Sequence, residues 1–285
     1  MSRIVYVNGA YVPEEEAKIS VFDRGFLFAD GVYEVTSVLG GKLVDFAGHI
    51  TRLWRSMGEL DMAAPVDEAE LEAIHRELIA RNALEEGLIY LQVTRGAADR
   101  DFAFPPEGTP SSLVLFTQAK PLIETAASKA GIKVSFVKDM RWFRRDIKTI
   151  QLLAPSLCKM KAKAVGKDDA WMVEDGMVTE GTSNNAYIVT QDGTLVTRNL
   201  SNAILHGITR KAVLRMAQEA QIKVEERAFS PEEARNAKEA FVTAASSFVQ
   251  PVVEIDGVTL SDGTPGPIAC RLREIYIDES LKTAT

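Results

Sequence analysis

Hydrophobic and polar positions alternate in two different ways along the first part of the chain. The run IVYVNGAYV (4–12) has two β-rich stretches about Asn8-Gly9, and YEVTSVLGGKLVDF (33–46) alternates apolar and polar residues around Gly40-Gly41. Both patterns predict β-hairpins. Apolar residues then recur every three or four positions over 48–57 and 67–82, which predicts amphipathic helices. Asp67 is in the position of an N-cap for the second helix.

Strand-like runs return at LIYLQVTRG (88–96) and SSLVLFTQA (111–119). The segment DRDFAFPPEGTP (99–110) separates them, and its prolines and glycine prevent regular structure through its second half. Unstructured connections of this length in compact domains are usually functional. We therefore expect a functional loop between these two strands.

The remainder of the chain also mixes strands and helices without a regular β-α-β repeat. Helices are expected over 153–165, 209–221 and 231–236, and strands over 132–140, 168–175, 184–190, 194–197, 223–229, 239–245 and in a last hairpin at 251–260. Small residues and a proline after Thr117 suggest a boundary. We expect an α+β protein of two domains, 1–119 and 128–285, joined by a linker at 120–127, with Lys148 in the second domain.

Composition limits the classes of function. The 285 residues are 46% hydrophobic and 26% charged, which is typical of a globular protein with a sizeable core. The net charge is −7 and the basic residues are scattered, so a nucleic-acid partner is not expected. No window approaches the ~20 apolar residues of a membrane span, and the chain starts without a targeting pattern. We expect a cytoplasmic protein with no membrane partner.

Metal and disulfide chemistry have no support in the sequence. The two cysteines, Cys158 and Cys270, do not form a CxxC or Cys/His cluster, and they are interpreted as inert thiols. His49, His75 and His206 are far apart in the sequence. Packing or surface roles are commoner for such histidines than metal ligation, so no metal site is expected.

Three segments can carry chemistry. Lys148 lies in RWFRRDIKTIQLL, where nearby arginines and an apolar run favour a nucleophilic amine, although such a lysine is more often an ordinary surface residue. Glu180, in GMVTEGTSNNAYIV, follows a strand and is either a held carboxylate or a plain hairpin residue. The segment NAILHGITRKAV places Gly207, Ile208 and Thr209 at a helix start, which is an anion site or a simple cap with Thr209 as N-cap.

Seven segments together resemble a known family of enzymes. They are FDRGFLFADGVYEV, HITRLWRS, YLQVTRG, DIKTIQLL, VTEGTSNNAYIV, LHGITRKAV and EAFVTAASS, in this order. The chain is similar, from the first hairpin to about Gly257, to the fold-type IV enzymes that depend on pyridoxal 5'-phosphate. This group contains D-amino acid transaminases, branched-chain aminotransferases and aminodeoxychorismate lyase. The resemblance implies the two-domain α+β fold of that group and a pyridoxal phosphate cofactor.

The resemblance implies roles for three residues near the reacting atoms. Lys148 matches the lysine that holds the cofactor as a Schiff base and moves the proton between substrate and cofactor. Glu180 matches the partner of the pyridine nitrogen, which keeps the ring protonated so that it accepts electrons. Tyr33 matches a tyrosine that lines the substrate pocket near the lysine.

Five further positions match residues that hold the cofactor phosphate. Arg52 in HITRLWRS matches an arginine that contacts it. Backbone N–H groups or a strand end would supply the other contacts, at Ile208, Thr209, Ala245 and Ser246.

Among the branches, the D-amino acid transaminases are the most similar. Arg100 matches an arginine that binds the substrate carboxylate from the neighbouring subunit. That subgroup usually has a histidine two positions later, whereas this chain has Phe102. Phenylalanine offers neither charge nor donor, so one polar contact would be lost and larger apolar substrates would be tolerated.

We therefore predict an aminotransferase that moves an amino group between a D-amino acid, such as D-alanine, and a 2-oxo acid. The alternatives are a branched-chain L-amino acid transaminase or an (R)-amine transaminase. Aminodeoxychorismate lyase and a non-catalytic binding module are weaker alternatives. The resemblance also implies a homodimer in which the subunit interface completes each active site.

Overall fold

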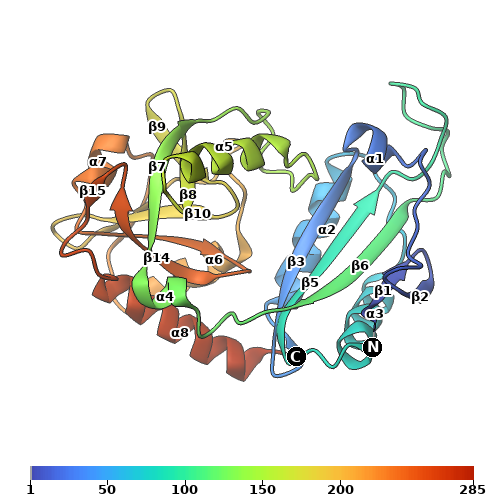
Figure 1. Ribbon diagram of the computed structural model, residues 1–285, viewed down its shortest axis with the longest axis horizontal. Helices are drawn as coiled ribbons and strands as arrows, with labels where there is room; N and C mark the ends of the chain where they lie inside the picture. The colour runs from blue at the N-terminus through green and yellow to red at the C-terminus, as the bar shows by residue number, and fades with distance from the viewer. Residues whose placement is uncertain (1) are drawn as a thin grey trace. The chain divides into compact units, whose positions relative to one another are not determined.

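The computed structural model describes residues 2–285 and divides into two compact units. The first, here called the N-terminal unit, contains the described residues up to Pro121 together with Ile147–Gln151 and Thr283–Thr285. The second, the C-terminal unit, contains Leu122–Asp146 and Leu152–Lys282. Each unit has its own β-sheet (Figure 1).

The N-terminal unit is a six-stranded antiparallel sheet in the order β2-β1-β6-β5-β3-β4. Two helices pack on it, α2 against β3 and α3 against β1 and β6. Its elements are β1 (Ile4–Val7), β2 (Ala10–Pro13), α1 (Arg24–Phe28), β3 (Gly31–Leu39), β4 (Lys42–Leu43), α2 (Phe46–Gly58), α3 (Glu68–Arg81), β5 (Glu86–Thr94) and β6 (Ser112–Ala119).

Both hairpins expected from the sequence are present, and their turns explain why. Asn8 and Gly9 have φ values of +46° and +95°, and Gly40 and Gly41 have values of +57° and +70°. A two-residue hairpin turn with positive φ at both positions matches the right-handed twist of its strands. The β1–β2 and β3–β4 pairs are the result.

Helices α2 and α3 confirm the two amphipathic helices predicted from the apolar spacing. In α3 the Asp67 side chain accepts a hydrogen bond from the Glu70 backbone N–H at 2.8 Å, as an N-cap should. The buried residues of α3 are spaced three and four apart, at Leu71, Ile74, His75, Leu78 and Ile79. This stripe buries one face of the helix against the sheet.

The C-terminal unit is built on a nine-stranded mixed sheet in the order β12-β11-β10-β13-β14-β7-β8-β9, with β15 paired to β14. The β11–β12, β14–β7 and β7–β8 pairs are parallel. Its elements are α4 (Ala126–Ala130), β7 (Ile132–Lys138), α5 (Leu153–Ala164), β8 (Asp169–Glu174), β9 (Met177–Gly181), β10 (Asn185–Val189), β11 (Leu195–Thr197), α6 (Ile208–Glu219), β12 (Val224–Glu226), α7 (Pro231–Arg235), β13 (Glu239–Ala244), β14 (Phe248–Ile255), β15 (Val258–Thr259) and α8 (Pro267–Thr283).

Side chains from the sheet and from α7 form the main core of this unit. Trp171 on β8, Phe229 before α7, and Val242 on β13 are fully or almost fully buried in it. Helix α5 packs on β7 and β8, and α6 packs on β12 and β13.

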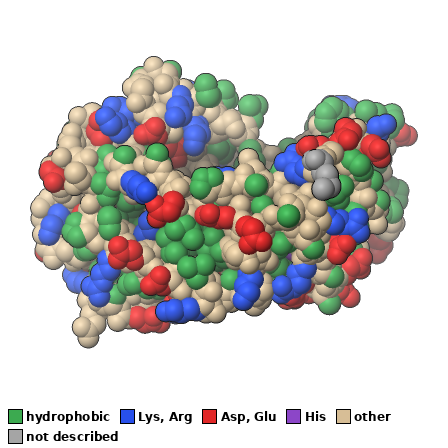
Figure 2. Space-filling model, turned by 60° about the horizontal axis from the view of Figure 1, so that its bottom comes forward, with side chains coloured by type: hydrophobic (Ala, Val, Ile, Leu, Met, Phe, Trp, Pro, Cys, Tyr) green, Lys and Arg blue, Asp and Glu red, His purple; other side chains and the backbone are tan. Residues whose placement is uncertain are grey.

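Figure 2 shows Lys and Arg side chains interspersed with Asp and Glu across the visible face. None of the helices in residues 2–285 is long and apolar enough to span a membrane.

Four elements of the structure were not predicted from the sequence. Helices α1 and α4 have five residues each, too few for a helical repeat, and they start at the side-chain caps Asp23 and Thr125. Helix α4 lies partly in the segment 120–127 that was expected to be a linker. Strand β9 contains Glu180, which was expected after a strand rather than in one. The long C-terminal helix α8 is only weakly amphipathic, since it buries Arg273 and Ser280 with its apolar residues.

The segment around Lys148 belongs to the N-terminal unit, whereas the sequence assigned it to the second domain. The backbone N–H of Tyr33 donates to the Lys148 carbonyl at 3.0 Å, and that of Ile150 donates to the Gly31 carbonyl at 3.1 Å. These bonds pair a short piece of chain with the start of β3. Long-range pairing of this kind leaves no local signal in a sequence.

Candidate active site

Lys148 is fixed by its backbone and has a free amine. Its carbonyl accepts from the Tyr33 N–H on β3, and its own N–H lies 3.4 Å from the Ser56 hydroxyl on α2. Its Nζ lies 3.9 Å from the centre of the Tyr33 ring. Among residues 2–285 no carboxylate lies within 4.0 Å of this amine, which is partly exposed. An amine that is partly exposed and not tied to a carboxylate is accessible to a carbonyl group.

Tyr33 is itself held by aromatic packing. Its ring stacks on Tyr90 with centres 5.6 Å apart, and Tyr90 stacks on Phe116 at 4.9 Å. The Tyr90 hydroxyl donates to Gln92 at 2.8 Å. Burial raises the pKa of Tyr90 above its ordinary value. This row of rings on β3, β5 and β6 is a rigid wall beside Lys148.

Arg52 lies on α2, one turn before Ser56, in a buried ionic cluster. Its Nε and Nη2 each donate to one oxygen of Glu34 at 2.7 Å, which is a bidentate pair. His49 Nδ1 lies 2.8 Å from the same carboxylate. Burial alone would raise the pKa of Glu34, but Arg52 and His49 outweigh it and lower the pKa to about 2. Glu34 therefore orients Arg52 from β3, one residue beyond Tyr33.

Glu180 lies on β9 in the C-terminal unit and is buried. Its carboxylate accepts hydrogen bonds from Arg141 Nη1 at 2.6 Å, Asn185 Nδ2 at 2.9 Å and the Leu205 backbone N–H at 3.1 and 3.2 Å. Burial raises the pKa of this carboxyl above its ordinary value, while Arg141 and Leu205 oppose the shift. Glu180 is thus a held carboxylate and not a plain hairpin residue.

The same contacts attach Glu180 to the start of helix α6. Asn185 also donates to the Leu205 carbonyl at 2.9 Å, two residues before the N-cap Gly207. A Cβ added to Gly207 would lie 2.2 Å from Asn185 Oδ1, so any other residue there would displace Asn185. Because Gly207 has no side chain to accept from the first helical N–H groups, these groups are available to an anion.

The alternative that Thr209 is an N-cap is wrong, because Gly207 has that position and Ile208 and Thr209 are the first two helical residues. Thr209 is buried. Helix α6 packs on β13, and Ala245 and Ser246 lie in the turn that joins β13 to β14. Four predicted phosphate contacts therefore belong to adjoining elements of the C-terminal unit.

Arg100 lies in the expected irregular segment between β5 and β6 of the N-terminal unit. Its guanidinium is 5.3 Å from the centre of the Phe28 ring and 5.6 Å from that of Phe102. The two rings meet edge to face at 5.6 Å. Phe102 is 81% exposed, which is unusual for phenylalanine.

Among residues 2–285 no group of three or more His, Cys, Asp or Glu side chains is arranged to hold a metal ion. His49 pairs with Glu34, and His75 is buried with its pKa lowered to about 4 by burial. Cys158 and Cys270 are free thiols, and burial raises the pKa of both.

The structure thus gathers the predicted residues in two places. Lys148, Tyr33 and Arg52 belong to the N-terminal unit, and Glu180, Ile208, Thr209, Ala245 and Ser246 belong to the C-terminal unit. Sequence reasoning missed Arg141, Asn185 and Leu205, which hold Glu180. The available signal was an arginine among aromatic residues and an asparagine at a strand start, since a buried carboxylate needs such partners.

Comparison with known proteins gives one consistent family. Residues 31–255 match the family described as amino-transferase class IV. The chain is 37% identical over 284 residues to a D-alanine aminotransferase of Bacillus licheniformis, covering 98% of this chain and 99% of the relative. A D-alanine aminotransferase of Staphylococcus aureus is 36% identical, with 95% of each chain covered. A branched-chain amino acid aminotransferase of T.th., solved with pyridoxamine 5'-phosphate, superimposes with a TM-score of 0.92 at 27% identity, covering 100% and 98% of the two chains.

Proposed function

Because the chain belongs to the class IV aminotransferases, which depend on pyridoxal phosphate, we propose that it transfers the amino group of a D-amino acid such as D-alanine to a 2-oxo acid. The observation that carries this proposal is the unpaired Lys148 amine on the face of Tyr33. The named relatives supply the substrate class.

The residues present fit the cofactor. Its aldehyde needs a free amine, which Lys148 has, and its phosphate needs N–H donors, which the uncapped start of α6 has. Its ring nitrogen needs a buried carboxylate, and Glu180 is one. Burial disfavours the charge of Glu180, so a cationic ring nitrogen beside it would relieve that cost.

When bound, pyridoxal phosphate supplies the aldehyde that takes up the amino group and the ring that withdraws electrons from the bond to be broken. Lys148 would hold it covalently through Nζ until the substrate amine takes that place, and the freed Nζ would then carry the proton from the substrate Cα. Glu180 would keep the ring nitrogen protonated, and Arg141 and Asn185 would orient Glu180. Tyr33 would form the pocket wall beside Nζ.

The phosphate would be held by the backbone N–H groups of Ile208 and Thr209, by the turn at Ala245 and Ser246, and by Arg52. Glu34 holds the Arg52 guanidinium in one orientation through two hydrogen bonds. A cation fixed in this way binds an anion without a further loss of side-chain freedom.

Arg100 would bind the substrate carboxylate, and Phe102 would present an apolar surface beside it. The exchange Phe102→His should restore one hydrogen bond to a charged group, worth roughly 1.5–3 kcal/mol, and so lower the KM for D-alanine by about tenfold or more. The KM for an amine without a carboxylate should not improve. An equal effect on both substrates would contradict this role.

A donor panel tests the proposed substrate class. The holoenzyme is mixed with D-alanine, D-glutamate, L-leucine or (R)-1-phenylethylamine, and the visible absorption of the bound cofactor is followed through the half-reaction. We expect the two D-amino acids to bleach the absorption rapidly. Fast reaction with L-leucine and none with D-alanine would overturn the assignment.

The second candidate is a branched-chain L-amino acid aminotransferase. It is favoured by the structural similarity to the solved branched-chain enzyme and by Phe102, which would suit an apolar side chain. An (R)-amine transaminase would also tolerate Phe102. The same donor panel separates all three, because each has a different preferred donor.

We further propose that the protein is a cytoplasmic homodimer whose interface includes α1 and the loop after β5. These two segments adjoin through the Arg24 N–H, which donates to the Gly96 carbonyl at 2.8 Å. Together with the turn just before α1, they expose apolar side chains that a partner would cover: Val21, Phe22, Phe26, Phe102 and Phe104. Sedimentation equilibrium should give the mass of two chains, and Phe26→Asp should lower it to the mass of one.

A further inference from the structure

An alternating row of charges extends from Glu180 through Arg141 to the surface of the C-terminal unit. Arg141 Nε and Nη2 lie 3.0 and 2.7 Å from the two oxygens of Asp139, whose carboxylate also accepts from the Arg141 backbone N–H at 3.0 Å. Arg145 Nη1 lies 3.7 Å from Asp139, and Arg145 binds Glu174 through two bonds of 2.7 and 2.6 Å. We call these five groups the charge row.

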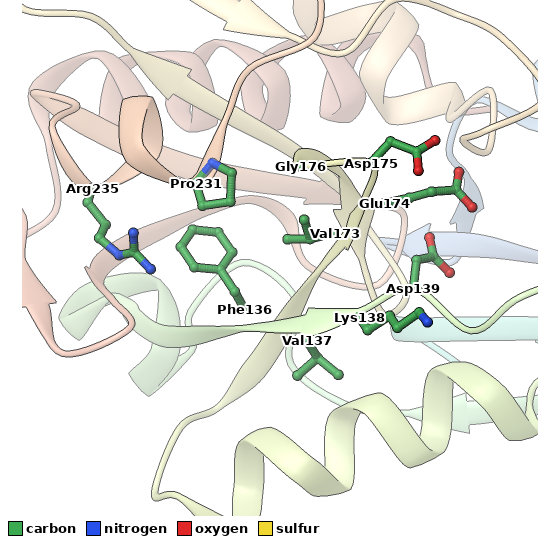
Figure 3. A pocket seen from close by; sticks show the side chains of 10 residues that line it. All are labelled: Phe136, Val137, Lys138, Asp139, Val173, Glu174, Asp175, Gly176, Pro231 and Arg235. Atoms are coloured by element: carbon green, nitrogen blue, oxygen red, sulfur yellow. The ribbon is translucent and has the colours of Figure 1, made fainter.

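The two ends of the row differ in exposure. The side chain of Asp139 is fully buried and that of Arg145 is 4% exposed, whereas that of Glu174 is 38% exposed. Asp139 and Glu174 both line an open pocket of about 590 Å³, where their carboxylates lie on the same side (Figure 3). Solvent therefore screens the outer end of the row and not the inner end.

Three carboxylates and two guanidinium groups give the charge row a net charge of −1. The two outer carboxylates are well compensated, because Asp139 and Glu174 each have a bidentate guanidinium. Glu180 has a single bond from a guanidinium that it shares with Asp139. The shortage of positive charge is thus greatest at Glu180. Burial raises the pKa of Glu180 despite Arg141, whereas Arg141 outweighs burial at Asp139 and lowers its pKa.

We propose that Asp139 and Arg145 are positioning residues that divide the charge of Arg141 between two carboxylates and leave Glu180 short of one cation, which the protonated ring nitrogen of the cofactor supplies. The proposal rests on the proposed function, and it adds residues that do not touch the cofactor. It also predicts in which direction each residue changes the affinity of Glu180 for a cationic ring. Arg145 limits the pull of Asp139 on Arg141, and Asp139 limits the compensation of Glu180.

Two substitutions should therefore act in opposite directions. Arg145→Gln removes a cation, so Asp139 attracts Arg141 more strongly and Glu180 gains affinity for a cationic ring. Asp139→Asn is isosteric and removes an anion, so Arg141 compensates Glu180 alone and that affinity falls. Loss of packing would weaken cofactor binding in both variants alike.

The test measures binding to the apoenzyme at pH 8 of two probes, pyridoxal phosphate and its analogue with a C–H group in place of the ring nitrogen. The ratio of the two dissociation constants, analogue over cofactor, reports the interaction of the ring nitrogen and cancels changes in phosphate binding. We expect the ratio to rise by about threefold or more in Arg145→Gln and to fall by about threefold or more in Asp139→Asn. Arg145→Lys, which keeps the charge, should restore the wild-type ratio.

Arg235→Gln is the matched control. Arg235 borders the same pocket and pairs with Asp256 at 2.9 Å, so its loss makes the same charge change outside the charge row. The ratio should stay at the wild-type value.

Ratios that are unchanged in both test variants, or that move in the same direction, would overturn the proposal. Failure of the proposed function gives a different result. If Glu180 does not serve the ring nitrogen, the ratio is close to one in the wild type and Glu180→Gln leaves it there.

Discussion

One buried ion pair, between Glu34 and Arg52, stabilises the N-terminal unit. Glu34 compensates Arg52 through two bonds and also contacts His49. Glu34→Gln leaves a buried guanidinium without its anion, so we expect the free energy of unfolding to fall by about 3 kcal/mol or more in a urea titration. The control is Glu59→Gln at the C-terminal end of α2, the helix that carries Arg52. The exposed pair of Glu59 with Arg55 is worth less than about 1 kcal/mol. Equal losses in the two variants would contradict this account.

His75 should make stability depend on pH. Burial lowers its pKa from 6.5 to about 4 in the folded protein. Between these values the unfolded chain binds a proton that the folded protein does not, so stability is lost as the pH falls from 6.5 towards 4. The loss is at most ~3 kcal/mol. Urea midpoints measured from about pH 7 to about pH 4 should fall less steeply in His75→Gln than in the wild type, and parallel curves would refute the assignment.

Candidate residues could be predicted singly, but their partners could not. Lys148, Glu180 and Arg52 stand in segments long enough to match a family pattern. The partners of Glu180 are Arg141, 39 positions before it, and the Leu205 backbone, 25 positions after it. Such pairings depend on tertiary packing, and a backbone donor carries no information in the residue type.

At the scale of elements, the start of α6 depends on the absence of a side chain. Gly207 has φ −65°, so alanine meets no backbone strain there, but its Cβ would lie 2.2 Å from the buried Asn185 Oδ1. Asn185 would have to move and would weaken its bond to Glu180. We expect Gly207→Ala to weaken pyridoxal phosphate binding to the apoenzyme by about tenfold. Gly58→Ala, with no atom within 4 Å of the added Cβ, should bind as the wild type does, and a normal affinity in Gly207→Ala would refute this reading.

Elements whose apolar residues recur at a regular spacing were predictable. Elements that are short, or whose buried face mixes polar with apolar residues, were not. Helix α3 and both N-terminal hairpins follow from apolar spacing and from residues that accept positive φ. Helices α1 and α4 are too short to show a period, and α8 hides its buried face because Arg273 is part of it. Arg273 satisfies this burial by donating to four backbone carbonyls.

At the scale of the whole molecule, the sequence predicted two α+β units and their order but not the path of the chain between them. Residues 147–151 belong to the N-terminal unit although residues on both sides belong to the other. The assignment of Lys148 to the second domain followed from chain order. Pairing with β3 overrides chain order, and it is this pairing that fixes the backbone of Lys148.

We propose that Lys148 binds the cofactor covalently. The most direct measurement is reduction of the holoenzyme with borohydride followed by proteolysis and mass spectrometry of the peptides. We predict one phosphopyridoxyl group per chain, on the peptide that contains Ile147-Lys148-Thr149, and none in Lys148→Ala. An adduct on another lysine, or no adduct in the wild type, would contradict the account.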